Sequence, residues 1–186
     1  LLLRELKIIA PDVRDDILSA LGTNGLARLL RSRMGTVSDL AGLHQVCSQG
    51  FMSETLGRLS LEEQVAILSR SRLGEIGTLM EYRSNAYRAS YERFVQRDLG
   101  HRLAGDGLDD IGKFIVRLQR VPGDGQRLSA EACELLLEND LTARVGQTDV
   151  KRLALLLLAV GSAGAKYPER VLAQAGQREA VEKGLD

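Results

Sequence analysis

Residues 108–118 have the sequence LDDIGKFIVRL, in which two carboxylates lead directly into a run of large apolar side chains. The apolar residues recur at the spacing of a helix face: Leu108, Ile111, Phe114, Ile115 and Leu118. Positions three and four apart lie above one another on an α-helix, so these side chains form one stripe. Acidic residues in a first turn interact favourably with the helix macrodipole. The stretch therefore predicts an amphipathic helix that packs on a core through this stripe.

Three other segments repeat this arrangement of a polar or acidic start followed by an apolar helical run, at Ser38–Leu40, Ser60–Glu63 and Thr148–Val150. The second is a capping box, in which the serine hydroxyl and the glutamate three residues later each bind a free backbone amide. Turn signals such as Pro122–Gly125 separate the helical segments. The sequence lacks the alternating β-branched runs that are typical of strands.

These features predict an all-α fold of stacked antiparallel helix pairs, a short helical-repeat array of about ten helices that forms one domain over residues 1–186. Asp110 and Asp149, which open two of the predicted helices, are 39 residues apart, a length similar to that of helical-hairpin repeats. A chain of this size buries roughly 70% of its unfolded surface and needs no disulfide or metal to fold. The predicted core includes Leu61, Val65, Leu68, Ile111, Phe114, Leu118, Leu153 and Leu157.

The longest predicted helix covers Glu75–Asp98, because this stretch has no proline and only one glycine, Gly77, before Gly100 ends it. It carries three of the four tyrosines, interleaved with arginines. Tyrosine and arginine are enriched at protein interfaces. The predicted partner-binding residues are Tyr82, Tyr87, Arg88, Tyr91, Arg93 and Arg97.

The charges of the chain are balanced, with 25 basic and 25 acidic side chains. Proteins that bind nucleic acids usually carry a basic excess, since phosphate neutralisation supplies most of their affinity. A chain of zero net charge is prone to association, which suits a subunit of an assembly. Other protein subunits are therefore favoured as partners over RNA. The alternative is sequence-tolerant RNA binding by the same helical array, centred on Tyr87, Arg88, Tyr91 and Arg93, with tyrosines that stack on bases and arginines that bind phosphates.

No residue pattern predicts an active site, so the chain is expected not to be an enzyme and to need no cofactor. His44 and Cys47 share a predicted helix face, but a zinc site needs at least three protein ligands. The remaining soft ligands, His101 and Cys133, are each isolated in the sequence, and no metal site is predicted. A Gly-Lys-Ser/Thr phosphate loop does not occur either.

No segment of the sequence is expected to cross a membrane, since the longest apolar run, Leu153–Val160, is far shorter than the roughly 20 residues required. The two cysteines are too few for a disulfide framework and fit a reducing compartment. The chain begins at Leu1 without a methionine, which removal of an import presequence would explain. The expected location is the mitochondrial matrix, with the cytoplasm as the alternative.

Helix starts with an acid followed by an aliphatic stripe resemble the degenerate helical-hairpin repeats of organellar proteins, the pentatricopeptide-like arrays. The segments that carry this resemblance are Asp110-Ile111 with Phe114 and Leu118, and Asp149-Val150 with Leu153 and Leu157. Such arrays include accessory subunits of mitochondrial assemblies, among them euglenozoan ATP synthase and organellar ribosomes. The resemblance implies a non-enzymatic structural or interaction subunit of a larger mitochondrial complex, such as ATP synthase or the ribosome. The irregular spacing of the helix starts departs from the RNA-reading members of these families.

A second resemblance is to annexin repeats. Residues 67–70, followed by Glu75-Ile76 and Tyr82, are similar to part of such a repeat, and residues 131–150 are similar to a repeat junction. This resemblance implies calcium-dependent binding to a membrane surface. The calcium loop Gly-x-Gly-Thr is incomplete, however, since Gln147 replaces its second glycine, and the chain is too short for four repeats.

Overall fold

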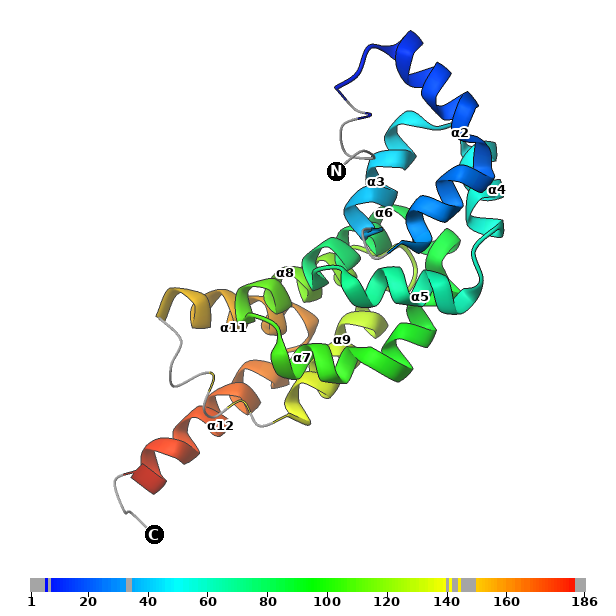
Figure 1. Cartoon of the computed structure of the whole chain (residues 1–186). Helices are drawn as coiled ribbons and strands as arrows, with labels where there is room; N and C mark the ends of the chain where they lie inside the picture. Colours follow the sequence, from blue (N-terminus) through cyan, green and yellow to red (C-terminus); the bar gives the residue numbers. More distant parts are fainter. Residues whose placement is uncertain are drawn as a thin grey trace.

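The computed structural model describes residues 6, 8–32, 35–139, 141, 144 and 150–182, with the backbone alone for 175–182. Helices contain 84% of the described residues, and none of these residues lies in a strand. The predicted all-α fold is therefore confirmed (Figure 1). None of the described helices combines the length and the apolarity that a membrane crossing requires. The predicted helix start at Thr148 and the loop around Gln147 lie outside the described residues.

Among the described residues, three helices form the N-terminal end: α2 (Pro11–Arg31), α3 (Val37–Val46) and α4 (Gln49–Gly57). The proline of α2 lies in its first turn, where the missing N–H costs no helical hydrogen bond. α2 bends at Gly22, whose φ of 58° and ψ of 178° glycine adopts readily. The second half of α2 buries Leu26 and Leu30, and α4 packs against both α2 and α3.

The middle of the chain contains α5 (Leu61–Arg70), α6 (Leu73–Phe94), a π-helical turn (Val95–Leu99) and α7 (Gly100–Gly105). The predicted capping box at the start of α5 is confirmed. The Ser60 amide donates to Glu63 Oε2 at 2.8 Å, and the Glu63 amide donates to Ser60 Oγ at 3.2 Å. At the other end of α5, the Arg102 guanidinium donates to the carbonyl oxygens of Ser69 and Ser71 at 2.5 and 2.7 Å. Arg102 therefore fastens α7 to the end of α5.

The longest helix differs from the prediction at both ends and in its interior. α6 begins at Leu73 instead of Glu75, and it is broken at Arg83, where φ is −141° and ψ is 26°. The expected stop at Gly100 is wrong, because the φ of −56° and ψ of −46° at this glycine are helical. The π-helical turn leads through Gly100 into α7, and the helical path ends at Gly105.

The C-terminal half contains α8 (Leu108–Gln119), α9 (Gly125–Leu137), α11 (Val150–Ala163) and α12 (Lys166–Glu182). α8 is central to the packing, since it contacts α6, α9 and α11. Its Asp110 carboxylate accepts a hydrogen bond from the Gly74 amide at 3.3 Å and so caps the start of α6. In Figure 1 the first half of α2 and the end of α12 lie at opposite ends of an elongated array.

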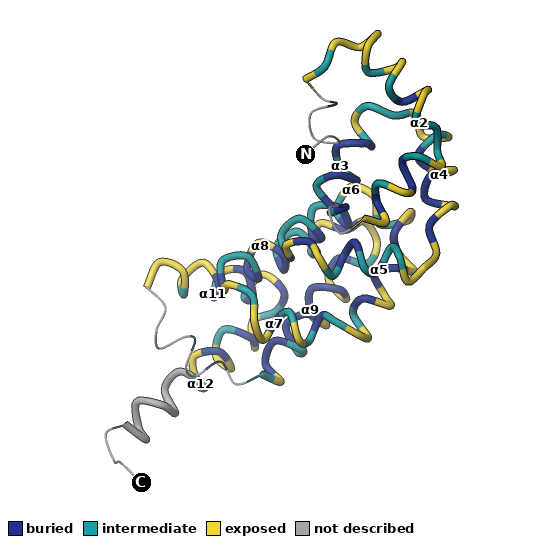
Figure 2. Tube along the Cα trace, viewed as in Figure 1, coloured by how far each residue is buried: buried dark blue, intermediate teal, exposed yellow. Residues whose placement is uncertain are grey.

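The buried apolar side chains form one cluster that runs from Leu6 to Val171 (Figure 2). The predicted core residues that are buried are Val65, Leu68, Ile111, Phe114 and Leu118. Leu153 and Leu157 are partly buried and pack against this cluster. The prediction is wrong for Leu61, which is 43% exposed. Leu61 is the first residue of α5, and the stripe that α5 buries begins one turn later.

Candidate functional site

The candidate site lies on the surface around the break in α6. It lies where α6 packs against α3, and the two residues at the break, Tyr82 and Arg83, are both exposed. The side chain of Tyr82 is 66% exposed, which is unusual for a residue with so much apolar area. Kinks commonly arise at proline or glycine, and neither occurs between Gly77 and Gly100.

His44, on α3, faces α6 just beyond the break. Its Nε2 atom and the Tyr87 hydroxyl are hydrogen-bonded at 2.9 Å, and the two rings meet edge to face with centroids 5.8 Å apart. Burial, and after it the charge of Arg83, lowers the pKa of His44 below its ordinary value of 6.5. The neutral imidazole is therefore favoured at physiological pH. A neutral imidazole presents one donor and one acceptor to its surroundings.

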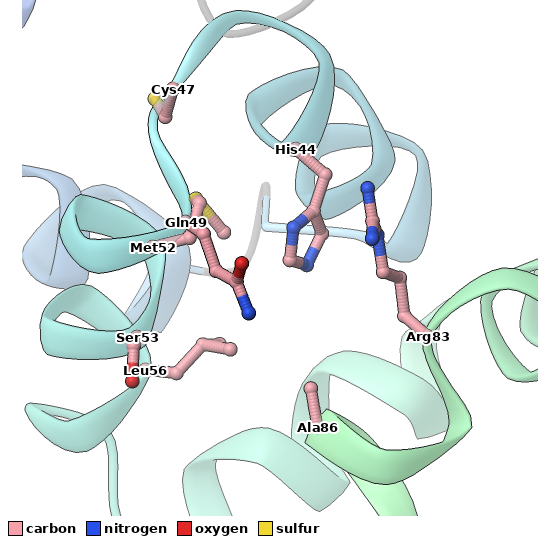
Figure 3. Close-up of a pocket in the computed structure, with 8 residues that line it drawn as sticks. All are labelled: His44, Cys47, Gln49, Met52, Ser53, Leu56, Arg83 and Ala86. Atoms are coloured by element: carbon pink, nitrogen blue, oxygen red, sulfur yellow. The ribbon is translucent and has the colours of Figure 1, made fainter.

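Two hollows flank His44 and Arg83. The first, of about 380 Å³, lies between α3, α4 and α6 and is lined by His44, Cys47, Gln49, Met52, Ser53, Leu56, Arg83 and Ala86. Figure 3 shows the His44 imidazole and the Gln49 amide directed into this hollow, with the Arg83 guanidinium beside the imidazole. The second, of about 370 Å³, lies between α3 and α6 and is lined by Ala41, His44, Gln45, Thr78, Leu79, Tyr82 and Arg83. Neither lining contains a carboxylate.

Arg83 gives the two hollows a positive charge that no described residue neutralises by contact. No carboxylate in the described part of the chain lies within ion-pair distance of its guanidinium, and no described side chain accepts a hydrogen bond from it. A guanidinium carries five donors in a planar fork that matches a carboxylate. The break in α6 therefore presents a tyrosine ring and an unneutralised guanidinium next to two hollows with amide groups and apolar walls.

The predicted partner-binding residues do not form one surface, and the tyrosines divide between the surface and the core. Tyr82 lies exposed at the break, whereas Tyr87 and Tyr91 are each 1% exposed. Tyr91 packs against Phe94 with 6.4 Å between ring centroids. Burial raises the pKa of both Tyr87 and Tyr91. These two rings are enclosed by the fold, so neither presents a face to an RNA base or to a partner.

The three predicted arginines are exposed and are paired within the chain. Arg88 lies 2.9 Å from Asp124, in the turn before α9. Arg93 and Arg97 both bind Glu62, at 3.3 and 2.7 Å, in the first turn of α5. Exposed ion pairs of this kind contribute about 0–1 kcal/mol each. The three arginines therefore connect helices, and of the predicted set only Tyr82 lies at the break.

Thiols and possible metal ligands add little chemistry to this region. Burial raises the pKa of the Cys47 thiol, and it raises the pKa of the Cys133 thiol to about 12. A protonated thiol is a poor nucleophile and a poor metal ligand. In the described part of the chain, no three His, Cys, Asp or Glu side chains lie close enough together to hold a metal ion.

The predicted partner-binding set omits His44, Gln45, Gln49 and Arg83, which line the hollows beside the break. Comparison with protein-family models, with curated proteins and with solved structures returned no match to this chain.

Proposed function

We propose that this chain is a non-enzymatic interaction subunit of a larger protein assembly and that it contacts a partner through the break in α6. The observation that carries the proposal is an exposed tyrosine, Tyr82, next to an exposed arginine, Arg83, for which the described residues provide no carboxylate partner. Tyrosine and arginine are the residue types that dominate interface energetics, together with tryptophan. They are most effective next to pockets from which a partner displaces water, and two hollows flank them here.

The chemistry of the site favours a partner segment with an acidic residue beside an apolar side chain. The Arg83 guanidinium would bind the carboxylate through two parallel hydrogen bonds, which are stronger than neutral ones. The neutral His44 and the Gln49 amide offer further hydrogen bonds at the wall of the first hollow. Met52 and Leu56 supply the apolar wall against which the partner's side chain would pack.

We further propose a mitochondrial assembly as the setting. The all-α fold agrees with the pentatricopeptide-like resemblance, whose members include accessory subunits of ATP synthase and of organellar ribosomes. The two cysteines, one buried and one partly buried as free thiols, are compatible with a reducing matrix. ATP synthase and the ribosome are therefore the first assemblies to examine.

Native separation of a source extract tests this proposal, with Tyr82→Ala and Arg83→Ala variants beside the wild type. The wild-type chain should migrate well above its own mass of 20.3 kDa. Each of these two alanine substitutions should weaken the binding of the chain to its partner about 30-fold, since loss of an interface hot spot costs roughly 2 kcal/mol or more. Arg58→Ala is the matched control, because Arg58 is an exposed arginine at the end of α4 whose carboxylate partner, Glu54, lies one turn earlier in the same helix.

Migration of the wild-type chain at its own mass would refute the assembly, wherever the interface lies. Retention of both Tyr82→Ala and Arg83→Ala in the large complex would instead refute the site while leaving the assembly in place. Far-ultraviolet circular dichroism of each purified variant checks that the helical content is unchanged. Both substituted side chains are exposed, so little loss of stability is expected.

A further inference from the structure

The first half of α2 forms a projecting helix with an acidic surface. Of residues 11–21, only Leu18 is buried, and Figure 2 shows this part of α2 as mostly exposed at one end of the molecule. Its exposed carboxylates are Asp12, Asp15 and Asp16, and Val13 between them is 48% exposed. Arg14 is the one cation in these eleven positions, and it binds Asp15 at 3.3 Å. A helical segment this short gains little stability without packing, so a partner that packs on its exposed face would stabilise it.

A surface of opposite charge occurs where α8 and α11 cross. A groove of about 290 Å³ lies between these helices, and its apolar floor consists of Gly112, Val116, Leu155 and Ala159. On the outer face of α11, Leu155 is 49% exposed and Leu158 is 71% exposed. Leucines with this exposure, one turn apart on one helix, form an apolar stripe without a partner helix in the described part of the chain.

Positive charge surrounds this groove. Among the described residues, Lys113, Arg117 and Arg120, the last at the end of α8, line the groove, and Lys151 and Arg152 lie in the first turn of α11. Two carboxylates offset part of this charge: Asp109 lies 3.3 Å from Lys113, and Glu81 lies 2.6 Å from Arg117 and 3.7 Å from Arg120. The groove is therefore apolar at its floor and basic at its rim, which is the complement of an acidic helix with an exposed valine.

We propose that the first half of α2 from one copy of the chain docks into the α8–α11 groove of a second copy. Its aspartates face Lys113 and Arg120, and Val13 covers Leu155 and Leu158. The two surfaces lie on different helices of the same chain, so the contact is heterologous and each added copy leaves one free surface of each kind. The result is a head-to-tail row of subunits. This contact uses none of the residues at the break in α6, and it goes beyond the proposed function.

Sedimentation velocity of the purified chain over a range of concentrations tests the proposal. The wild type should form species larger than 20.3 kDa that grow with concentration without stopping at a dimer. Association should weaken between ~0.1 M and ~1 M NaCl, because the screening length falls from about 10 Å to about 3 Å.

Charge reversal identifies the two surfaces. An Asp15→Lys, Asp16→Lys variant and a Lys113→Glu, Arg120→Glu variant should each associate more than about tenfold more weakly than the wild type, since like charges then face each other. An equimolar mixture of the two variants should regain association, because every contact between unlike variants pairs opposite charges again. Each variant is compared with the wild type by circular dichroism, which checks that the helices are intact.

A wild type that stays monomeric at every concentration would overturn the proposal. So would a mixture of the two charge-reversed variants that associates no more tightly than either variant does separately. Association that survives both charge reversals but is lost in Leu158→Ser would also overturn it, in favour of a symmetric apolar contact between two α11 helices.

Discussion

The crossing of α6 and α8 depends on a missing side chain at Gly77. A Cβ atom at this position would lie 2.8 Å from the Cβ of Arg117, 3.1 Å from the carbonyl oxygen of Phe114 and 3.3 Å from its Cα. Real Cβ atoms essentially never approach another atom as closely as 2.8 Å, and the two longer contacts, both with the backbone of α8, are tighter than nine in ten real Cβ contacts. Gly77→Ala therefore forces the two helices apart, because the crowded atoms belong to rigid parts of the facing helix.

Two opposing effects determine the size of the change. Alanine is a better helix former than glycine and gains about 0.5–1 kcal/mol within a helix. Overpacking of a tight contact costs about 1–3 kcal/mol, and the backbone contacts place this site in the upper part of that range. The expected net result is a destabilisation of about 1–2 kcal/mol. With an m-value of about 2 kcal/mol/M, the urea midpoint falls by about 0.5–1 M.

Gly100→Ala is the matched control for this measurement. Gly100 is helical, and a Cβ there would have no neighbour within 4 Å. Only the helix-propensity gain applies, so this variant should be more stable than the wild type by about 0.5–1 kcal/mol. Urea unfolding followed by circular dichroism compares the two. A Gly77→Ala variant as stable as Gly100→Ala would show that the α6–α8 crossing relaxes freely, and it would refute the reasoning.

Four further predictions concern a helix cap, a helix junction, the protonation of His44 and the hydrogen bond of Tyr87. Ser60→Ala should lose about 1 kcal/mol of stability in urea unfolding, since it removes the oxygen that accepts from the Glu63 amide. Arg102→Met should lose about 1–3 kcal/mol in the same assay, because two carbonyl oxygens at the end of α5 lose their donors. The pKa of His44 is lower in the folded chain than its ordinary 6.5, so its contribution to stability is present above pH 6.5 and lost as pH falls through the folded pKa. A comparison of urea midpoints near neutral and near mildly acidic pH should show this loss of stability in the wild type and a smaller loss in His44→Gln. Tyr87→Phe should unfold at a lower urea concentration than the wild type at both pH values, because its hydrogen bond to His44 is gone.

Local chemistry was sufficient to predict the helical class and several helix boundaries. The capping box at Ser60 and Glu63 depends on side chains within one turn, and the structure contains both of its hydrogen bonds. The stripe of α8 is buried as predicted, because a period of three to four residues places its members on one face whatever they pack against. Gly100 shows the limit of such signals, since glycine permits a helix end but does not require one.

The burial of Tyr87 and Tyr91 had a signal in the sequence. Tyr87, Tyr91 and Phe94 are spaced by four and three residues, which is the spacing of a buried stripe. Tyr82 lies outside this series, and it is the tyrosine that the structure leaves exposed. The position of a tyrosine relative to the apolar stripe of its helix thus decides between core and surface better than its proximity to arginine does.

The break at Arg83 could not be predicted, because its cause is not local. The nearest glycine on its N-terminal side is Gly77, and no proline lies in α6. The residues gathered around the break come from three helices, and their contacts depend on how α3 and α4 pack beside α6. A site of this kind depends on tertiary packing, and helical periodicity carries no information about it.

Arginine content alone does not identify a surface for partners in this chain, because many of its guanidinium groups join helices to one another. Arg70 donates to the carbonyl oxygens of Leu30 and Gly35 at 3.3 Å, and so connects α5 to the end of α2. Arg102 connects the same end of α5 to α7 through two carbonyl oxygens. A planar fork that reaches two acceptors suits this role better than a lysine ammonium does. Arg83 makes no such contact with the residues that the structure describes, so its donors can bind a molecule outside the chain, and the break in α6 is therefore the surface to mutate first.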